Sequence, residues 1–141
     1  MQSATEAPWA PVNIGADINS ANRVLLIDDD PLQLRVREAV LRDAGIEVDV
    51  ATTAESALAL LRSEAGQSIG TIVTDHIMPG ASGAVFVRAL REIKPDVPVI
   101  VISGMAEAED EYGGMNVRFR TKPCPPPELI ALVKKSLHDG R

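Results

Sequence analysis

The sequence has little cysteine, few aromatic residues and no excess of positive charge. Its single cysteine, Cys124, excludes a disulfide within the chain and any zinc site built from several cysteines. Aromatic residues are 3% of the 141 residues and hydrophobic residues 45%, so the core must be aliphatic. The 20 acidic and 14 basic residues give a net charge of −6, which repels nucleic acid and anionic membranes. We therefore expect no direct binding to DNA.

Long hydrophobic segments are also missing. No apolar run approaches the length of a membrane span, and the N-terminus has neither the basic start nor the apolar stretch of a secretory signal. These absences predict a cytoplasmic protein that does not bind membranes. Its length suits one domain, for which we expect an irregular leader over residues 1–22, a domain over residues 23–138 and a short tail over residues 139–141. Trp9 falls in this leader, which we interpret as a tail without fixed structure.

Helical patterns alternate with short apolar runs throughout the domain. The first helix is predicted to start at Pro31 behind the N-cap Asp30 and to end at Gly45. A capping-box spacing at Thr52 and Glu55 precedes the second helix. The segment after residue 104 is rich in acidic residues and glycine and predicts a poor helix. The apolar runs predict strands over residues 24–27, 46–50, 72–74 and 99–102, and a weaker one from residue 117. Such alternation is typical of a parallel sheet covered by helices on both faces.

Polar side chains follow four of the predicted strands. Asp28 and Asp29 follow the first, Asp75 the third, Ser103 the fourth and Lys122 the last. Because the carboxyl ends of parallel strands share one edge of a sheet, we expect these side chains to lie together. Like-charged carboxylates about 4 Å apart repel by about 4 kcal/mol per pair at an effective dielectric near 20, so the cluster favours a bound dication. The oxygen donors predict magnesium.

This set of residues suits phosphoryl transfer to a carboxylate. Asp75 would attack phosphorus as a nucleophile and form an acyl phosphate. The Lys122 ammonium would offset negative charge, and the Ser103 hydroxyl would donate to a phosphoryl oxygen. Taken singly, Ser103 is more simply a strand-end cap and Lys122 a solvated surface residue, and Asp30 remains a helix cap. The hypothesis depends on their joint placement.

Four segments resemble, in order, the motifs of the receiver domain of two-component response regulators: VLLIDDDP, TIVTDHIMPG with Gly83, VIVISG and TKP. The resemblance extends from about residue 23 to residue 138. It implies a flavodoxin-like, doubly wound (βα)5 fold whose five-stranded parallel sheet has the strand order 2-1-3-4-5. It also implies that Asp75 is the phosphoacceptor. Magnesium, or manganese in its place, would be bound by Asp75, by Asp29 directly, by Asp28 largely through water and by the backbone carbonyl of Ile77.

The resemblance further implies how a signal leaves the site. Ser103 would move toward the phosphoryl group, Phe119 would swing into the vacated space, and the face formed by the fourth helix, fifth strand and fifth helix would change. Lys122 is the invariant lysine of the family. Pro79, Gly83 and Pro123 are implied to be structural, with a cis Lys122-Pro123 bond. The implied partners are a sensor histidine kinase or histidine phosphotransfer protein and a downstream protein bound through that face, with the chain a monomer or a phosphorylation-dependent dimer.

The sequence departs from the family near this output face. Arg120 stands where relatives usually carry an apolar strand residue, and Cys124 replaces a common aromatic. The fourth helix is short and interrupted by glycine. Arg118 and Arg120 are interpreted either as charges that protect an exposed strand or as contacts for an acidic partner.

Other functions remain open at the level of sequence. The chain is either a separate regulator, which Met1 and the leader favour, or the receiver module of a hybrid histidine kinase. A magnesium-dependent phosphatase with an aspartate nucleophile would need a second acid at position 77, which is Ile77. A flavin or nucleotide module would need a glycine-rich loop where the run Asp28 to Asp30 stands. A scaffold without phosphorylation would not need the complete polar set. We therefore expect a signalling domain with slow self-dephosphorylation, not an enzyme.

Overall fold

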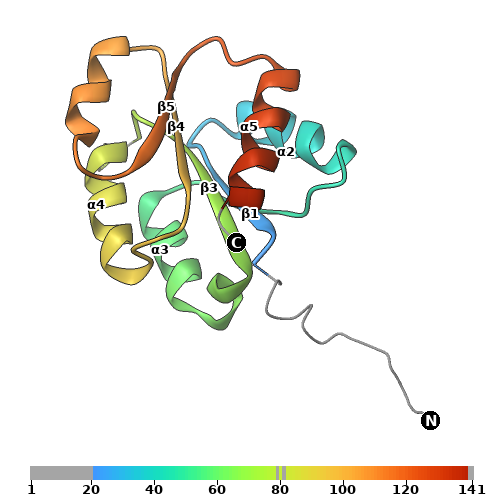
Figure 1. Ribbon diagram of the computed structural model, residues 1–141, viewed down its shortest axis with the longest axis horizontal. Helices are drawn as coiled ribbons and strands as arrows, with labels where there is room; N and C mark the ends of the chain where they lie inside the picture. The colour runs from blue at the N-terminus through green and yellow to red at the C-terminus, as the bar shows by residue number, and fades with distance from the viewer. Residues whose placement is uncertain (1–20, 79, 81, 140–141) are drawn as a thin grey trace.

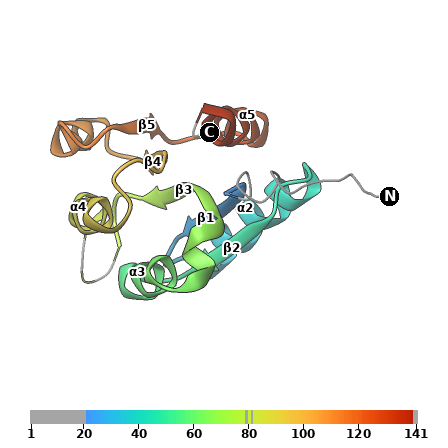
Figure 2. The same cartoon turned by 60° about the horizontal axis from the view of Figure 1, so that its bottom comes forward.

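The computed structural model describes residues 21–78, 80 and 82–139. The predictions for Trp9, for Pro79 and for the leader before residue 21 lie outside the described residues. Five parallel strands form one sheet in the described part, in the order β2-β1-β3-β4-β5 (Figure 2). They are β1 (Arg23–Ile27), β2 (Val48–Ala51), β3 (Ile69–Asp75), β4 (Val99–Ser103) and β5 (Val117–Thr121). This topology confirms the predicted flavodoxin-like fold.

Helices connect the strands and cover both faces of the sheet (Figure 1). The α-helices are α2 (Pro31–Asp43), α3 (Ala54–Arg62), α4 (Gly83–Ile93) and α5 (Pro126–Asp139), and the 3-10 helices are η1 (Glu64–Ser68) and η2 (Ala106–Tyr112). The helices α2 and α5 pack on one face, with α3 and α4 on the other. Because both faces are covered, β3 and β4 are buried along their whole length, which explains the continuous apolar run of β4.

The local signals predicted most helix ends. Asp30 caps α2 by accepting hydrogen bonds from the backbone nitrogens of Leu32 and Gln33, and Gly45 has φ 85° just beyond the helix. The cap of α3 lies one residue later than predicted. Thr53 and Ser56 form its capping box, because the Ser56 hydroxyl replaces the expected Glu side chain.

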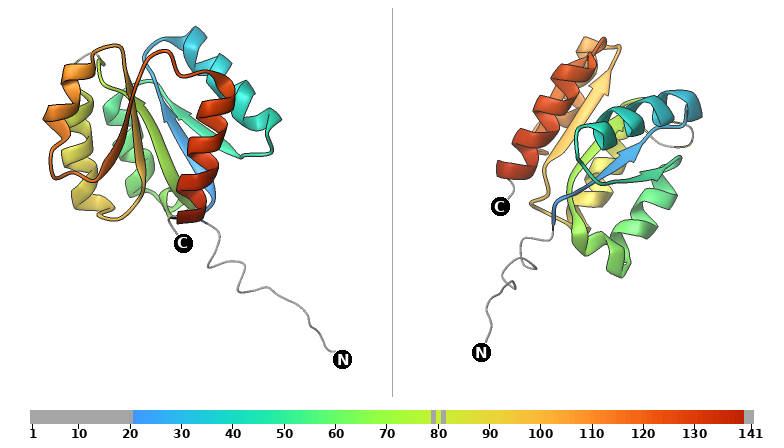
Figure 3. Two further views of the ribbon diagram at one scale, coloured as in Figure 1. Left: turned by 45° about the horizontal axis from the view of Figure 1, so that its top comes forward. Right: turned by 90° about the vertical axis from the view of Figure 1, so that its right-hand side faces the viewer.

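The last part of the sheet is unusual, as its sequence suggests. The predicted poor helix is η2, a 3-10 helix on the same side of the sheet as α4 (Figure 3). In β5, Val117 and Phe119 pack toward the core, whereas Arg118 and Arg120 form ion pairs with α5. Arg118 pairs with Asp139 at 2.8 Å and Arg120 with Glu128 at 3.5 Å. Both arginines of this edge strand therefore have acidic partners within the domain.

Candidate functional site

The predicted site residues meet in one pocket at the carboxyl ends of the strands. Asp28 and Asp29 follow β1, Asp75 and Ser103 end β3 and β4, and Lys122 follows β5. The pocket has a volume of about 210 Å³, and Ile77 also lines it. These site residues are far apart in the sequence, from position 28 to position 122. They share one cavity because the five strands of the described part are parallel, so that their carboxyl ends lie together.

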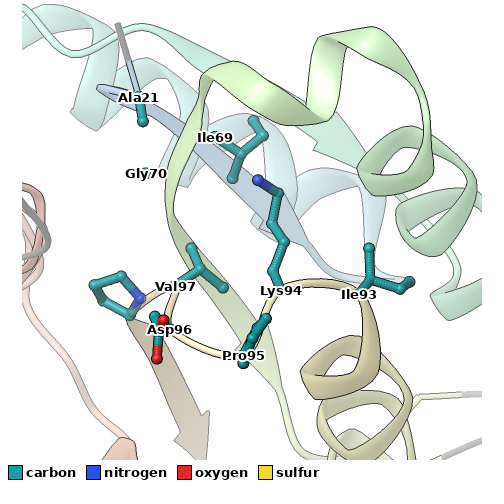
Figure 4. Close-up of a pocket in the computed structure, with 9 residues that line it drawn as sticks. Ala21, Ile69, Gly70, Ile93, Lys94, Pro95, Asp96 and Val97 are labelled. Carbon is teal, nitrogen blue, oxygen red and sulfur yellow. The ribbon is translucent and has the colours of Figure 1, made fainter. Parts of the chain in front are cut away.

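Another pocket lies at the opposite end of the strands, where they begin (Figure 4). It is formed where β3 begins, at Ile69 and Gly70, and where the loop from Lys94 to Pro98 enters β4. Asp75 is the last of the seven residues of β3, so it lies about 20 Å from this pocket along an extended strand. Its lining has one lysine and one aspartate, so it offers no cluster comparable to the acidic pocket.

Two of the three carboxylates are buried close together. Asp28 is 1% exposed and Asp75 5% exposed. Burial and the neighbouring Asp28 carboxyl together raise the pKa of Asp75 to about 6, against the opposing effect of the Arg37 and Lys122 charges. The phosphoacceptor candidate therefore sits where a carboxylate without a cation is costly.

Three cationic or amide groups surround this pair. The Lys122 ammonium lies 3.4 Å from Asp75 Oδ1, as its predicted role requires. The Arg37 guanidinium lies 3.3 Å from Asp28 Oδ2 and 3.4 Å from Asp75 Oδ1. The Gln33 amide donates to both carboxylates, at 3.2 Å to Asp75 Oδ2. The sequence motifs did not predict Gln33 and Arg37 as site residues. Their four-residue spacing, which puts both on one face of α2 just after the acidic pair, was the available signal.

The donor set fits a hard divalent cation. The pocket offers carboxylates from Asp28, Asp29 and Asp75 and has Ile77 at its rim, so the available ligands are oxygen atoms. Among residues 21–78, 80 and 82–139, no three histidine, cysteine or acidic side chains are already arranged around one point. Asp29 is exposed, while Asp28 and Asp75 lie inside. Carboxylates from two strand ends, completed by a carbonyl and water, are the kind of ligand set that magnesium prefers.

The two predicted switch residues lie on neighbouring strands, Ser103 at the end of β4 and Phe119 within β5. The Ser103 hydroxyl is buried and accepts a hydrogen bond from the Met105 backbone nitrogen at 2.9 Å, so it is held by the following loop. Phe119, in β5, packs against Tyr112 with 5.9 Å between ring centroids. The Lys122-Pro123 bond between β5 and α5 is cis, as expected.

A buried hydrogen bond next to Asp75 was not predicted. The Nδ1 atom of His76 lies 2.7 Å from the Tyr112 hydroxyl, and its Nε2 atom lies 3.5 Å from the Glu111 carboxylate. Burial raises the pKa of Tyr112, so the phenol stays protonated. With the imidazole proton on Nε2, which faces Glu111, Nδ1 accepts a hydrogen bond from the phenol. This bond joins the end of β3 to η2.

Gly83 makes that junction sterically feasible. A Cβ atom at position 83 would lie 2.4 Å from the Tyr112 hydroxyl oxygen and 2.8 Å from the Asp75 carbonyl oxygen. The Gly83 backbone nitrogen also donates to the His76 carbonyl. A side chain at the residue predicted to be structural would therefore collide with the end of β3 and with Tyr112.

Known proteins share both the sequence and the fold. The response regulator receiver domain family matches residues 24–134, which is most of the chain. The chain belongs to this family. It is 39% identical over 118 residues to the transcriptional regulatory protein PrrA of Mycobacterium tuberculosis, covering 82% of this chain and 49% of PrrA. The chain thus spans about half the length of this curated relative.

Solved structures agree with this assignment. A response regulator receiver protein from Sinorhizobium medicae is 31% identical with a TM-score of 0.74, covering 84% of this chain and 96% of that one. A CheY-like receiver domain from Methanospirillum hungatei has a TM-score of 0.78 at 24% identity, covering 84% and 95%, and supports the fold alone. The chain is thus a receiver domain of the two-component type. Its family typically binds magnesium and acts in signalling rather than as an enzyme. Within the described residues, no helix is long and apolar enough to cross a membrane.

Proposed function

We propose that the domain accepts a phosphoryl group on Asp75 from a phosphohistidine of a sensor histidine kinase or histidine phosphotransfer protein. The observation that carries the proposal is the buried Asp75 carboxylate beside the Asp28 carboxylate, with the Lys122 ammonium 3.4 Å away. A lone pair of an Asp75 carboxylate oxygen attacks phosphorus, and the phosphorus–nitrogen bond to the donor imidazole breaks. The imidazole nitrogen keeps the electron pair of that bond.

The residues around Asp75 have separate tasks in this step. Lys122 neutralises charge on the phosphoryl oxygens, and Ser103 donates its hydroxyl hydrogen to one of them after it leaves the Met105 loop. Asp28, Asp29, Asp75 and the Ile77 carbonyl would hold magnesium, which when bound offsets the negative charge that gathers at the site. Water later attacks phosphorus, and the bond between phosphorus and the Asp75 oxygen breaks. Inorganic phosphate is released and the free carboxylate is restored, which makes the signal transient.

The output is proposed to be binding of another protein. Movement of Ser103 toward the phosphoryl group changes the space beside Phe119, and Phe119 contacts Tyr112 of η2. A downstream partner would therefore detect phosphorylation on the face formed by β5, α5 and η2, where η2 is the helix predicted as the fourth. The domain would act either as a separate regulator or as the receiver module of a hybrid histidine kinase, and either as a monomer or as a phosphorylation-dependent dimer.

The test uses a small phosphodonor in place of the kinase. The protein is incubated with acetyl phosphate and magnesium chloride, and its intact mass is measured. We expect one added phosphoryl group, none in Asp75→Asn and none when a chelator removes the metal. Asp30→Asn is the matched control because this neighbouring carboxylate caps α2, and it should be phosphorylated like the wild type. An adduct that persists in Asp75→Asn would refute the assignment of the phosphoacceptor.

A further inference from the structure

Arg37 occupies the position between the two buried carboxylates. Its side chain is 12% exposed, although it is an arginine on a surface helix. One guanidinium nitrogen lies 3.3 Å from Asp28 Oδ2 and 3.4 Å from Asp75 Oδ1, so a single donor group bridges both acids. Gln33, one turn earlier on α2, bridges the same pair through its amide. The acidic pocket therefore has a resident cation that the sequence motifs do not include.

These contacts use the carboxylate oxygens that a metal ion would need. Asp28 Oδ1 accepts from the Asp30 backbone nitrogen at 2.9 Å, and Asp28 Oδ2 accepts from Gln33 and Arg37. Asp75 Oδ1 faces both Arg37 and Lys122, and its Oδ2 accepts from Gln33. A dication and the guanidinium would repel each other strongly if both contacted the same oxygens. Binding of a metal at this pair therefore requires Arg37 to move.

A further cavity can hold the Arg37 side chain after it leaves the carboxylates. It has a volume of about 350 Å³ and lies between α2 and the start of α5. Arg37 lines it together with Val36, Val40 and Cys124, and both Gln33 and Lys122 line this cavity and the acidic pocket alike. The guanidinium can thus leave the carboxylates by a rotation of its own side chain, with α2 unchanged.

We propose that Arg37 is a positioning residue that serves as the counter-cation of the metal-free acidic pocket and is displaced when magnesium binds. This inference rests on the proposed function, because it assigns the pocket to a divalent cation. The guanidinium stabilises the Asp28 and Asp75 charges before the metal arrives, and it weakens metal binding because the metal must compete with it. Arg37 therefore sets the magnesium concentration at which the pocket fills.

The test measures metal binding directly. Wild type, Arg37→Met and Arg35→Met are titrated with magnesium chloride by isothermal titration calorimetry at low ionic strength. Arg35→Met is the matched control, since Arg35 is an exposed arginine on the same helix and its loss changes the net charge equally. We expect Arg37→Met to bind magnesium about tenfold more tightly and Arg35→Met to stay within about twofold of the wild type. Arg37→Lys, which keeps the charge, should stay within about threefold.

Stability supplies a second readout. Without metal, Arg37→Met should unfold at a lower urea concentration than Arg35→Met, and saturating magnesium should remove most of that difference. Unchanged or weaker magnesium binding in Arg37→Met would overturn the proposal. If Asp75 is phosphorylated in a magnesium-dependent reaction while Arg37→Met binds magnesium like the wild type, only the role of Arg37 fails. If no variant binds magnesium and no phosphoryl adduct forms, the proposed function fails with it.

Discussion

At the scale of single residues, the defining property of this domain is that the ionised form of the Asp75 carboxyl group is energetically unfavourable. Asp75 is buried beside Asp28, and the charges of Arg37 and Lys122 offset only part of the cost, so its pKa rises to about 6. The same environment that makes the ionised form costly makes a bound cation favourable. The cost of ionising Asp75 and the proposed binding of a cation beside it thus have one physical cause.

The raised pKa predicts how stability depends on pH without metal. The ordinary pKa of an aspartate is 3.8 and that of folded Asp75 is about 6, so the folded state binds the proton more tightly. The stability that the folded state gains from this tighter proton binding is fully present below pH 3.8, and it is lost as the pH rises through 6. Asp75→Asn stays neutral, so its stability gain over the wild type should grow between pH 4 and pH 7, by up to about 3 kcal/mol.

Urea unfolding at several pH values in a chelator measures this difference. Asp43→Asn serves as the control because Asp43 is an exposed aspartate at the end of α2, and its effect should depend less on pH. A gain in Asp75→Asn that is as large at pH 4 as at pH 7 would contradict the account of Asp75.

At the scale of elements, η2 is attached to the end of β3 through His76, which makes a buried hydrogen bond with Tyr112 and lies 3.5 Å from the Glu111 carboxylate. The segment is a short 3-10 helix, which contributes little stability of its own. Tyr112 holds it through the hydrogen bond to His76 and through contact with Phe119. A structural change at the end of β3 would therefore reach η2 through direct side-chain contacts.

Removing the Tyr112 hydroxyl should loosen this element selectively. Tyr112→Phe keeps the ring but leaves Nδ1 of the buried His76 without its partner, which costs about 1–3 kcal/mol of stability. Hydrogen exchange followed by mass spectrometry should show faster exchange across η2, with α2 on the opposite face as the internal control. Equal acceleration in α2 would mean that the bond stabilises the whole domain and does not specifically hold η2.

At the scale of the molecule, two hydrophobic clusters enclose the sheet. One packs under α3, α4 and η2, the other under α2 and α5, and β1, β2, β3 and β4 contribute to both. The polar site lies where the strands leave these clusters, so it depends on the rigidity of both layers. Loss of packing in either layer should lower the stability of the entire domain.

Two leucines of α2 test this dependence on burial. Leu41 is 0% exposed and Leu32 is 72% exposed, and both lie in the same helix. Leu41→Ala should cost about 2–5 kcal/mol because it leaves a cavity in the core. Leu32→Ala should change stability by less than about 0.5 kcal/mol. Urea unfolding gives both values, and a similar loss in the two variants would show that helix propensity, not core packing, determines the effect.

Much of the fold and site could be predicted because the relevant signals are local. The alternation of apolar runs and helical patterns indicates a parallel sheet, and the residues directly after each strand must then lie at one edge. That reasoning is sufficient to bring Asp28, Asp75, Ser103 and Lys122 into one pocket. The cap of α3 was misplaced by one residue because threonines occupy both positions 52 and 53, and serine can replace Glu in the box.

The sequence by itself determined the strands, their polar ends and hence the chemistry of the acidic pocket, since each follows from the order of neighbouring residues. Only the tertiary structure decided that Arg37 bridges Asp28 and Asp75, and that His76 meets Tyr112. Both contacts depend on how a helix is rotated against the sheet. That rotation is set by packing between segments far apart in the chain, which no local pattern encodes.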